Sequence, residues 1–176
     1  MIQARIEPAT EADIPLVYET WLRNYWGVNA KHTRARRPLC HMDIELYFAE
    51  QRRLIDRLLE RSIVLVARDP DDEVLRYGWI AFEQSPPTLH YVYVKYPIRS
   101  TATCRRGLGT QLMEAFHPGF GKDMFFYTHQ TYSMSFLKDK WKGIYNPYIL
   151  MEGHSNGDFS SGHEAEAVRG TAEQRR

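Results

Sequence analysis

One stretch near the middle of the chain constrains the fold more than any other. Residues 89–97 are rich in aromatic and β-branched side chains and end at a proline, which is typical of a strand. After a loop, residues 105–110 read Arg-Arg-Gly-Leu-Gly-Thr and open a helical run through Phe116. The first turn of a helix has backbone N–H groups without internal partners, and glycine lets an anion approach them closely. The sequence therefore predicts a strand, a phosphate-binding turn and a helix in succession.

Two common phosphate-binding motifs do not fit this turn. A dinucleotide-binding turn has a third glycine where this chain has Leu112, and it usually lies in the first βα unit, whereas several strands are expected to come before this turn. A P-loop ends in Gly-Lys-Ser/Thr, and the chain contains no such sequence. The turn therefore belongs to another class of phosphate site.

Hydrophobic periodicity and turn residues predict ten elements. They are a strand over 2–7, helices over 10–25 and 43–61, strands over 62–68, 74–84 and 88–96, a helix ending near 118, a strand over 124–129, a helix over 132–141 and a strand over 144–151 interrupted by Pro147. Thr10 and Asp13 resemble a capping box at the start of the first helix. We expect the second helix to bury one face, formed by Ile44, Phe48, Ile55 and Leu58.

The phosphate turn resembles the signature of the GNAT superfamily of N-acetyltransferases. That signature reads Gln/Arg-x-x-Gly-x-Gly/Ala directly after a strand, and residues 104–109 read Cys-Arg-Arg-Gly-Leu-Gly. Only Cys104 departs from it. The predicted element order is also similar to the GNAT fold, over residues 2 to about 151. The resemblance implies an α+β fold with a mixed central sheet of six to seven strands, flanked by helices, in which a splayed strand pair holds the arm of CoA.

The resemblance also implies acetyl-CoA as the acyl donor. The CoA pyrophosphate would bind at the turn, through Arg105, Arg106, Gly107, Leu108, Gly109 and Thr110. The pantetheine arm would run along the preceding strand and bond to its backbone at Val92 and Val94. No metal is predicted.

Acyl transfer to an amine needs a base for the amine and an acid for the departing thiolate. Many GNAT enzymes use a tyrosine on the helix after the fifth strand as the acid, but here Phe136 or Leu137 falls at that place. Tyr127 and Tyr132 are the nearest substitutes, and Tyr145 is a weaker one. The candidate bases are His129, His90 and Glu83, with a water relay as the alternative.

In GNAT proteins the connection between the first two helices borders the acceptor site. Here it reads Lys-His-Thr-Arg-Ala-Arg-Arg over residues 31–37, which is either a solvated charge run or a contact for an anionic acceptor. The expected acceptor-side residues are Tyr25, Trp26, Arg34, Arg36, Arg37 and Glu83.

Composition sets the remaining limits. The chain has 176 residues, of which 43% are hydrophobic, and this suits one domain over residues 1–152. Residues 153–176 have too few apolar side chains to form an ordered structure, so we expect them to be a mobile tail. The formal charge of +1 does not favour nucleic acid or membrane as a partner. Two cysteines without metal-ligand spacing suggest reduced thiols in the cytoplasm. A monomer and a homodimer both remain open.

The resemblance to the GNAT superfamily implies an acyl-CoA-dependent N-acetyltransferase in which the amine attacks acetyl-CoA directly in a ternary complex. Two alternatives stay open: a GNAT-like enzyme that modifies nucleic acid, and a non-catalytic binding or inhibitor protein on the same scaffold. The sequence does not identify the acceptor, because acceptor loops vary freely on one fold.

Overall fold

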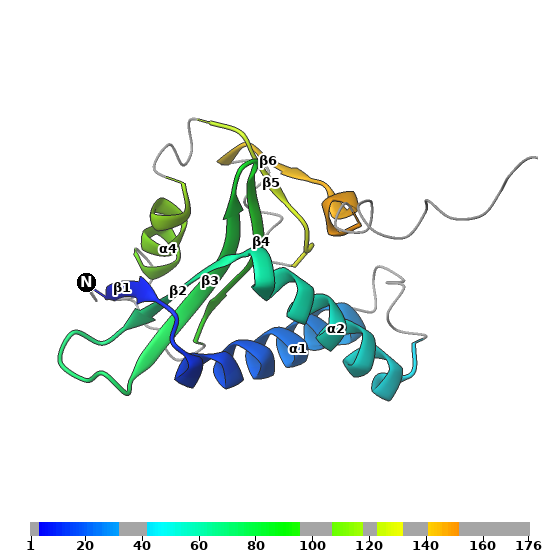
Figure 1. Cartoon of the computed structure of the whole chain (residues 1–176), viewed down its shortest axis with the longest axis horizontal. Helices are drawn as coiled ribbons and strands as arrows, with labels where there is room; N and C mark the ends of the chain where they lie inside the picture. Colours follow the sequence, from blue (N-terminus) through cyan, green and yellow to red (C-terminus); the bar gives the residue numbers. More distant parts are fainter. Residues whose placement is uncertain (1–3, 32–41, 96–106, 118–122, 132–140, 152–176) are drawn as a thin grey trace, which may run out of the picture.

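A computed structural model of the chain describes residues 4–31, 42–95, 107–117, 123–131 and 141–151, with the backbone alone for residues 27–31. Its centre is a six-stranded mixed sheet in the order β1-β2-β3-β4-β5-β6. Helices α1 and α2 cover one face of the sheet and α4 covers the other (Figure 1). This architecture confirms the predicted α+β class and the mixed sheet flanked by helices.

The chain enters through strand β1 (Arg5–Pro8) and the short 3₁₀ helix η1 (Glu11–Asp13), which continues into α1 (Ile14–Lys31). The predicted capping contact is present, because the Asp13 carboxylate accepts hydrogen bonds from the backbone N–H and the hydroxyl of Thr10, both at 2.8 Å. Val17 and Trp21 on the predicted face of α1 are fully buried.

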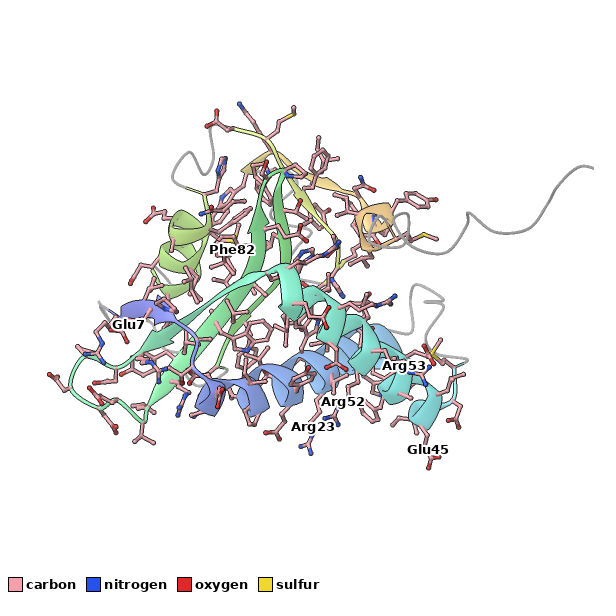
Figure 2. All side chains as sticks on the ribbon, in the orientation of Figure 1. Glu7, Arg23, Glu45, Arg52, Arg53 and Phe82 are labelled. Atoms are coloured by element: carbon pink, nitrogen blue, oxygen red, sulfur yellow. The ribbon has the colours of Figure 1, made fainter. Side chains whose placement is uncertain are left out.

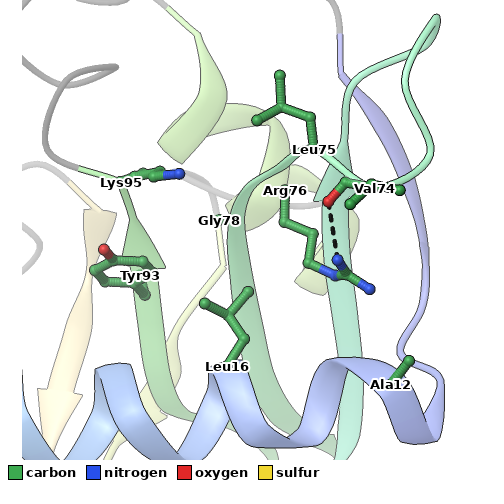
Figure 3. Close-up of a pocket in the computed structure, with 8 residues that line it drawn as sticks. All are labelled: Ala12, Leu16, Val74, Leu75, Arg76, Gly78, Tyr93 and Lys95. Atoms are coloured by element: carbon green, nitrogen blue, oxygen red, sulfur yellow. Dashed lines mark hydrogen bonds between the residues drawn. The ribbon is translucent and has the colours of Figure 1, made fainter.

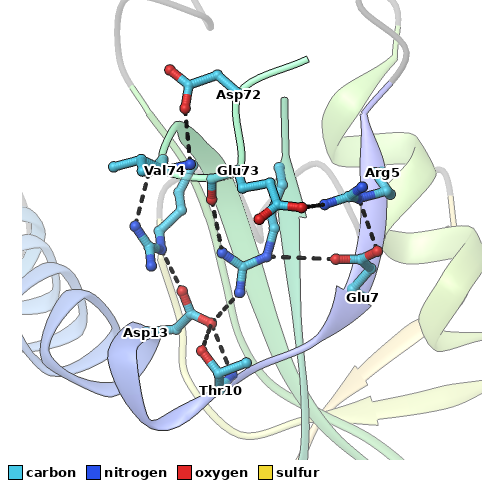
Figure 4. Close-up of polar contacts among 9 residues, drawn as sticks. Arg5, Glu7, Thr10, Asp13, Asp72, Glu73 and Val74 are labelled. Atoms are coloured by element: carbon cyan, nitrogen blue, oxygen red, sulfur yellow. Dashed lines mark hydrogen bonds and ion pairs between the residues drawn. The ribbon is translucent and has the colours of Figure 1, made fainter. Parts of the chain in front are cut away.

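Asp13 is also the centre of a charge network that ties the start of α1 to the sheet (Figure 4). Its buried carboxylate accepts from the guanidinium groups of Arg68 and Arg76. Arg68 reaches Glu7 at 3.6 Å, and Glu7 pairs with Arg5 at 2.8 Å. Burial by itself would raise the pKa of Asp13, but the hydrogen bonds from Thr10 and Arg76 and the charge of Arg68 lower that pKa to about 2.

Helix α2 (Ile44–Arg61) begins at Asp43, whose carboxylate accepts from the backbone N–H groups of Glu45 and Leu46. Its buried face consists of Tyr47, Gln51, Ile55 and Leu58. The expectation of burial at Ile44 was wrong, because this side chain is 46% exposed. Tyr47 is buried instead of Ile44, and the centroid of its ring lies 4.7 Å from that of Trp26 on α1.

Three antiparallel strands form the body of the sheet: β2 (Ile63–Arg68), β3 (Arg76–Gln84) and β4 (Pro87–Val94). The Asp69 carboxylate accepts from the backbone N–H groups of Asp71 and Asp72 and so forms the predicted turn between β2 and β3. Gly78 is required in β3, since a Cβ there would lie 2.3 Å from the backbone oxygen of Tyr93 on β4.

The C-terminal half adds α4 (Leu108–Phe116) and two short strands, β5 (Phe125–Tyr127) and β6 (Gly143–Tyr145). Both strands run parallel to their neighbour on the β4 side. The last strand was predicted over 144–151, but it ends at Tyr145, because Asn146 caps the 3₁₀ helix η3 (Pro147–Leu150). The helix predicted over 132–141 lies almost wholly outside the described residues, as does the polar segment after 152.

The sheet separates two hydrophobic clusters. On the α4 face, Leu108, Leu112, Met113 and Phe116 pack with strand residues that include Phe82, and the Phe82 and Phe116 rings lie 5.1 Å apart. On the α1–α2 face, Val17, Trp21, Ile55 and Leu58 pack with Trp79 and Tyr91. Figure 2 shows Phe82 inside, between sheet and α4, whereas Arg23, Arg52 and Arg53 project outward from α1 and α2.

Candidate active site

The sheet opens between β4 and β5. The two strands pair only at Thr88 with Phe126 and Leu89 with Tyr127, and one further bond runs from the Thr128 N–H to the Leu89 oxygen at 3.1 Å. Beyond that point β4 continues to Val94 while the chain after β5 leads away from it (Figure 1). Among the described residues no strand pairs with this part of β4 on that side.

The backbone groups of Val92 and Val94 point into this opening. The Lys95 N–H donates to the Tyr77 oxygen at 2.8 Å, so Lys95 faces β3 with its backbone. Backbone direction alternates along an antiparallel strand, and the register pairs Val94 with Gly78 and Val92 with Ile80. The N–H and C=O groups of Val92 and Val94 are therefore directed away from β3, toward the β5 side.

Helix α4 follows β4 in the chain and begins at Gly107. Its first turn contains Leu108, Gly109 and Thr110. Leu108 is buried in the core, so its side chain packs and only its backbone N–H is available at the helix start. A Cβ built on Gly109 meets no atom within 4 Å, which leaves the backbone at this position open to approach. The other predicted phosphate contacts, Arg105 and Arg106, lie outside the described residues.

A chain of buried polar side chains lies where β4 and β5 part. His90 Nε2 lies 2.8 Å from Glu83 Oε1, and His90 Nδ1 lies 3.0 Å from Thr128 Oγ1. Thr128 Oγ1 lies 2.9 Å from Nδ1 of His129. The two histidine rings and Thr128 are almost fully buried. The structure thus joins Glu83, His90 and His129, which the sequence proposed separately as bases.

Two side chains of helix α2 contact the two ends of this row of polar side chains. Arg61 Nε forms an ion pair with Glu83 Oε1 at 2.9 Å, and the Glu83 side chain is 19% exposed. At the other end the Gln51 amide nitrogen lies 3.4 Å from His129 Nε2, near the limit of a hydrogen bond. The polar side chains therefore run from a partly exposed carboxylate to a buried imidazole.

Burial keeps both imidazoles neutral. Burial and then the charge of Arg61 lower the pKa of His90 to about 3. Burial is also the main effect that lowers the pKa of His129, and the charge of His90 lowers it further. The backbone of His90 raises this pKa, but the two other effects are larger and bring it to about 3. Each ring therefore carries one proton near neutral pH, on one nitrogen only.

Aromatic side chains surround His129 on the α1–α2 face. Its ring lies edge-on to Tyr25 at 5.0 Å and to Trp21 at 5.3 Å. The Trp21 indole N–H is buried and has no hydrogen-bond partner among the described residues. A buried donor without a partner is uncommon in folded proteins. Of the two aromatic residues predicted on the acceptor side, Tyr25 thus contacts His129, whereas Trp26 packs on Tyr47 and Phe48.

Tyr127 lies on the opposite face. It belongs to the core beneath α4, and its ring packs on Tyr145 at 5.4 Å. Burial and then Tyr145 raise its pKa, so its hydroxyl keeps its proton at neutral pH. Tyr127 and His129 are therefore near each other in the chain but belong to different faces of the sheet.

Several predicted site residues lie outside the described part of the chain, namely Tyr132, Arg34, Arg36 and Arg37. In return, the structure adds Thr128, Gln51 and Arg61, which the sequence did not single out. Gln51 had a visible signal, since it is a polar residue on the apolar stripe of α2. Thr128 had none, because its role depends on the register between β4 and β5.

A separate pocket of about 230 Å³ lies between the start of α1, the beginning of β3 and the end of β4 (Figure 3). Its lining combines aliphatic side chains with Arg76, Tyr93 and Lys95. The Arg76 guanidinium is already held by Asp13 and by the Val74 oxygen at 2.8 Å. The pocket is smaller than most ligand sites.

The described residues contain no group of three or more His, Cys, Asp or Glu side chains placed to hold a metal ion. No helix in the same part of the chain is long and apolar enough to cross a membrane.

Comparisons with known proteins identify no family. No protein-family model matches the sequence, and no curated protein matches it. One solved structure, described as a transcriptional regulator from Bacillus halodurans C-125, aligns over 92% of this chain and 98% of its own, with 14% sequence identity and a TM-score of 0.34. A TM-score of this size is too low to establish a shared fold.

Proposed function

We propose that this protein is an acyl-CoA-dependent N-acyltransferase that moves an acetyl group from acetyl-CoA to an amine. The observation that carries the proposal is the opening between β4 and β5: the backbone groups of Val92 and Val94 face away from β3, no described strand pairs with them on that side, and a glycine turn comes next in the chain. An extended pantetheine arm can add to such an edge as a strand would. The pyrophosphate then meets the start of α4, whose N–H groups attract an anion.

The two faces of the sheet supply different parts of the site. The donor approaches along the α4 face, where the helix start and Tyr127 lie. The acceptor approaches from the α1–α2 face, where aromatic rings surround His129. Nucleophile and thioester meet in the opening, since it interrupts the sheet. His129 accepts the amine proton, and the thiolate has two candidate proton sources: Tyr127 and the histidine chain itself.

The acceptor is an amine of unidentified structure. The basic segment over residues 31–37 supports an anionic acceptor, with nucleic acid as the less favoured class because the formal charge of the chain is only +1. The salt dependence of the acceptor KM separates an anionic acceptor, nucleic acid included, from an acceptor without negative charge. Salt screens the attraction of an anion to the basic segment, so only the KM of an anionic acceptor should rise with salt.

Replacing Gly109 with alanine separates cofactor binding from folding. The added methyl meets no protein atom within 4 Å, and alanine favours a helix over glycine by about 0.5–1 kcal/mol, so we expect a small gain in stability. The same methyl stands where the pyrophosphate approaches the backbone. Losing one charge-assisted hydrogen bond should weaken acetyl-CoA binding about tenfold or more. Calorimetric titration and a melting curve measure both effects.

Glu114→Ala on the exposed side of the same helix is the control, and its acetyl-CoA affinity should equal that of the parent. Parental affinity in Gly109→Ala would show that the pyrophosphate binds elsewhere. Absence of acetyl-CoA binding in the parent protein would refute the proposed function.

A further inference from the structure

The polar chain between Glu83 and His129 has only one consistent arrangement of protons. A carboxylate paired with Arg61 can only accept, so the His90 Nε2 facing Glu83 carries a hydrogen. Because His90 is neutral, its Nδ1 is bare and accepts the Thr128 hydroxyl hydrogen. That hydroxyl has no second hydrogen, so its oxygen accepts from His129.

The same reasoning determines the state of His129. Its Nδ1 carries the hydrogen that Thr128 accepts, and a neutral ring then has a bare Nε2. The Gln51 amide, the one described hydrogen-bond partner at this nitrogen, is a donor at 3.4 Å, which agrees with a bare acceptor held only weakly. A single charge at Glu83 thus aligns every hydrogen bond in one direction, from Gln51 to Glu83.

We propose that His129, Thr128, His90 and Glu83 form a directional proton relay that serves acyl transfer. The inference rests on the proposed function and assigns the base of that reaction to His129 Nε2. Thr128, His90 and Glu83 act through His129, so they are positioning and relay residues. The amine nitrogen takes the place of the Gln51 amide at Nε2 of His129, whose ring lies 5.3 Å from the Trp21 ring.

The relay balances every proton. As the nitrogen attacks the thioester carbon, its proton passes to His129 Nε2 while the proton on His129 Nδ1 passes to Thr128 Oγ1. The Thr128 hydroxyl proton moves to His90 Nδ1, and the proton on His90 Nε2 moves to Glu83. When the C–S bond breaks, the shift runs in reverse, and His129 Nε2 delivers the proton to the thiolate. Amide and thiol are the products, and the relay returns to its starting arrangement.

The relay gives a reason for two buried histidines that are connected through a hydroxyl group. A buried imidazole disfavours a positive charge, and a lone His129 would have to hold one during the reaction. In the relay both rings are neutral before and after the shift, and the added proton rests on Glu83, which is the partly exposed member. The charge change therefore occurs at the end nearest solvent.

Thr128→Val tests the relay because it keeps the side-chain shape and removes the hydroxyl that connects the rings. We expect kcat to fall by about 10²-fold or more, with acetyl-CoA affinity unchanged. Thr128→Ser restores the hydroxyl, so its kcat should lie within about threefold of the parental kcat. Thr20→Val is the matched control, since it breaks a similar hydrogen bond, from Trp79 at 2.8 Å, outside the relay.

A nitrogen-15 NMR spectrum of the histidine rings gives a second readout that does not require activity. The parent protein should show His90 as the Nε2–H tautomer and His129 as the Nδ1–H tautomer. Mixed or reversed tautomers, or full turnover in Thr128→Val, would overturn the relay. The predicted tautomers in a protein that binds no acetyl-CoA would support the proton alignment and refute the acyltransferase function.

Discussion

Replacing His129 with glutamine should lower kcat by about 10²–10⁴-fold, the usual contribution of a general base, and leave acetyl-CoA affinity at the parental value. Glutamine still fills the space beside Trp21 and Tyr25 and can still bond to Thr128, but it cannot take a proton. The loss should therefore appear in kcat rather than in donor binding. Steady-state kinetics of thiol release and a calorimetric titration measure the two quantities.

His117→Gln provides the matched control. His117 lies at the far end of α4, so the same substitution there should leave kcat unchanged. A melting curve for each variant separates lost chemistry from lost folding. Parental kcat in a folded His129→Gln protein would mean that water, rather than this imidazole, removes the amine proton.

Asp13→Asn should lower the free energy of unfolding by about 3–5 kcal/mol at neutral pH, the typical effect of breaking a buried ion pair. Asp13 is fully buried between Arg68 and Arg76, and asparagine leaves both guanidinium groups without their shared carboxylate. Urea unfolding at pH 7 measures the loss. Glu7→Gln is the control, since Glu7 is a partly exposed member of the same network and should cost at most about 1 kcal/mol.

The effect of Asp13 should also depend on pH. The folded pKa of about 2 lies below the ordinary value of 3.8, so the ionised carboxylate stabilises the fold above about pH 4. This stabilisation, ~2 kcal/mol from the pKa difference, is lost as pH falls through the folded pKa. The gap between parent and Asp13→Asn should narrow from pH 4 toward pH 2. A gap that stays constant over this range would contradict the lowered pKa.

The elements that are determined by residues close together in the sequence could be predicted from the sequence alone. Asp69 and its following residues indicated the turn between β2 and β3, and the glycines at 107 and 109 indicated the start of α4. Periodicity alone could not tell which turn of α2 is covered, so Ile44 was expected inside although Tyr47 occupies the interior. The end of the last strand was missed because the Asn146 side chain, rather than Pro147, begins the next helix.

The candidate site was predictable only in part. His90 and His129 were visible as possible bases, but the bond between them runs through Thr128 and depends on the parallel register of β4 and β5. Register between strands so far apart in the chain follows from tertiary packing rather than from local pattern. Val92 and Val94 were assigned to the donor through family resemblance, and their orientation toward the opening is known from the pairing with β3.

Residue-resolved amide exchange with and without acetyl-CoA tests the central claim most directly. The account predicts that the N–H groups of Val92 and Val94 exchange quickly in the free protein and become protected at saturating acetyl-CoA, because the pantetheine bonds to this edge of β4. The N–H groups of Tyr91 and Tyr93 face β3 and should be slow in both states. Binding of acetyl-CoA without any change at Val92 and Val94 would contradict the placement of the donor in the strand opening.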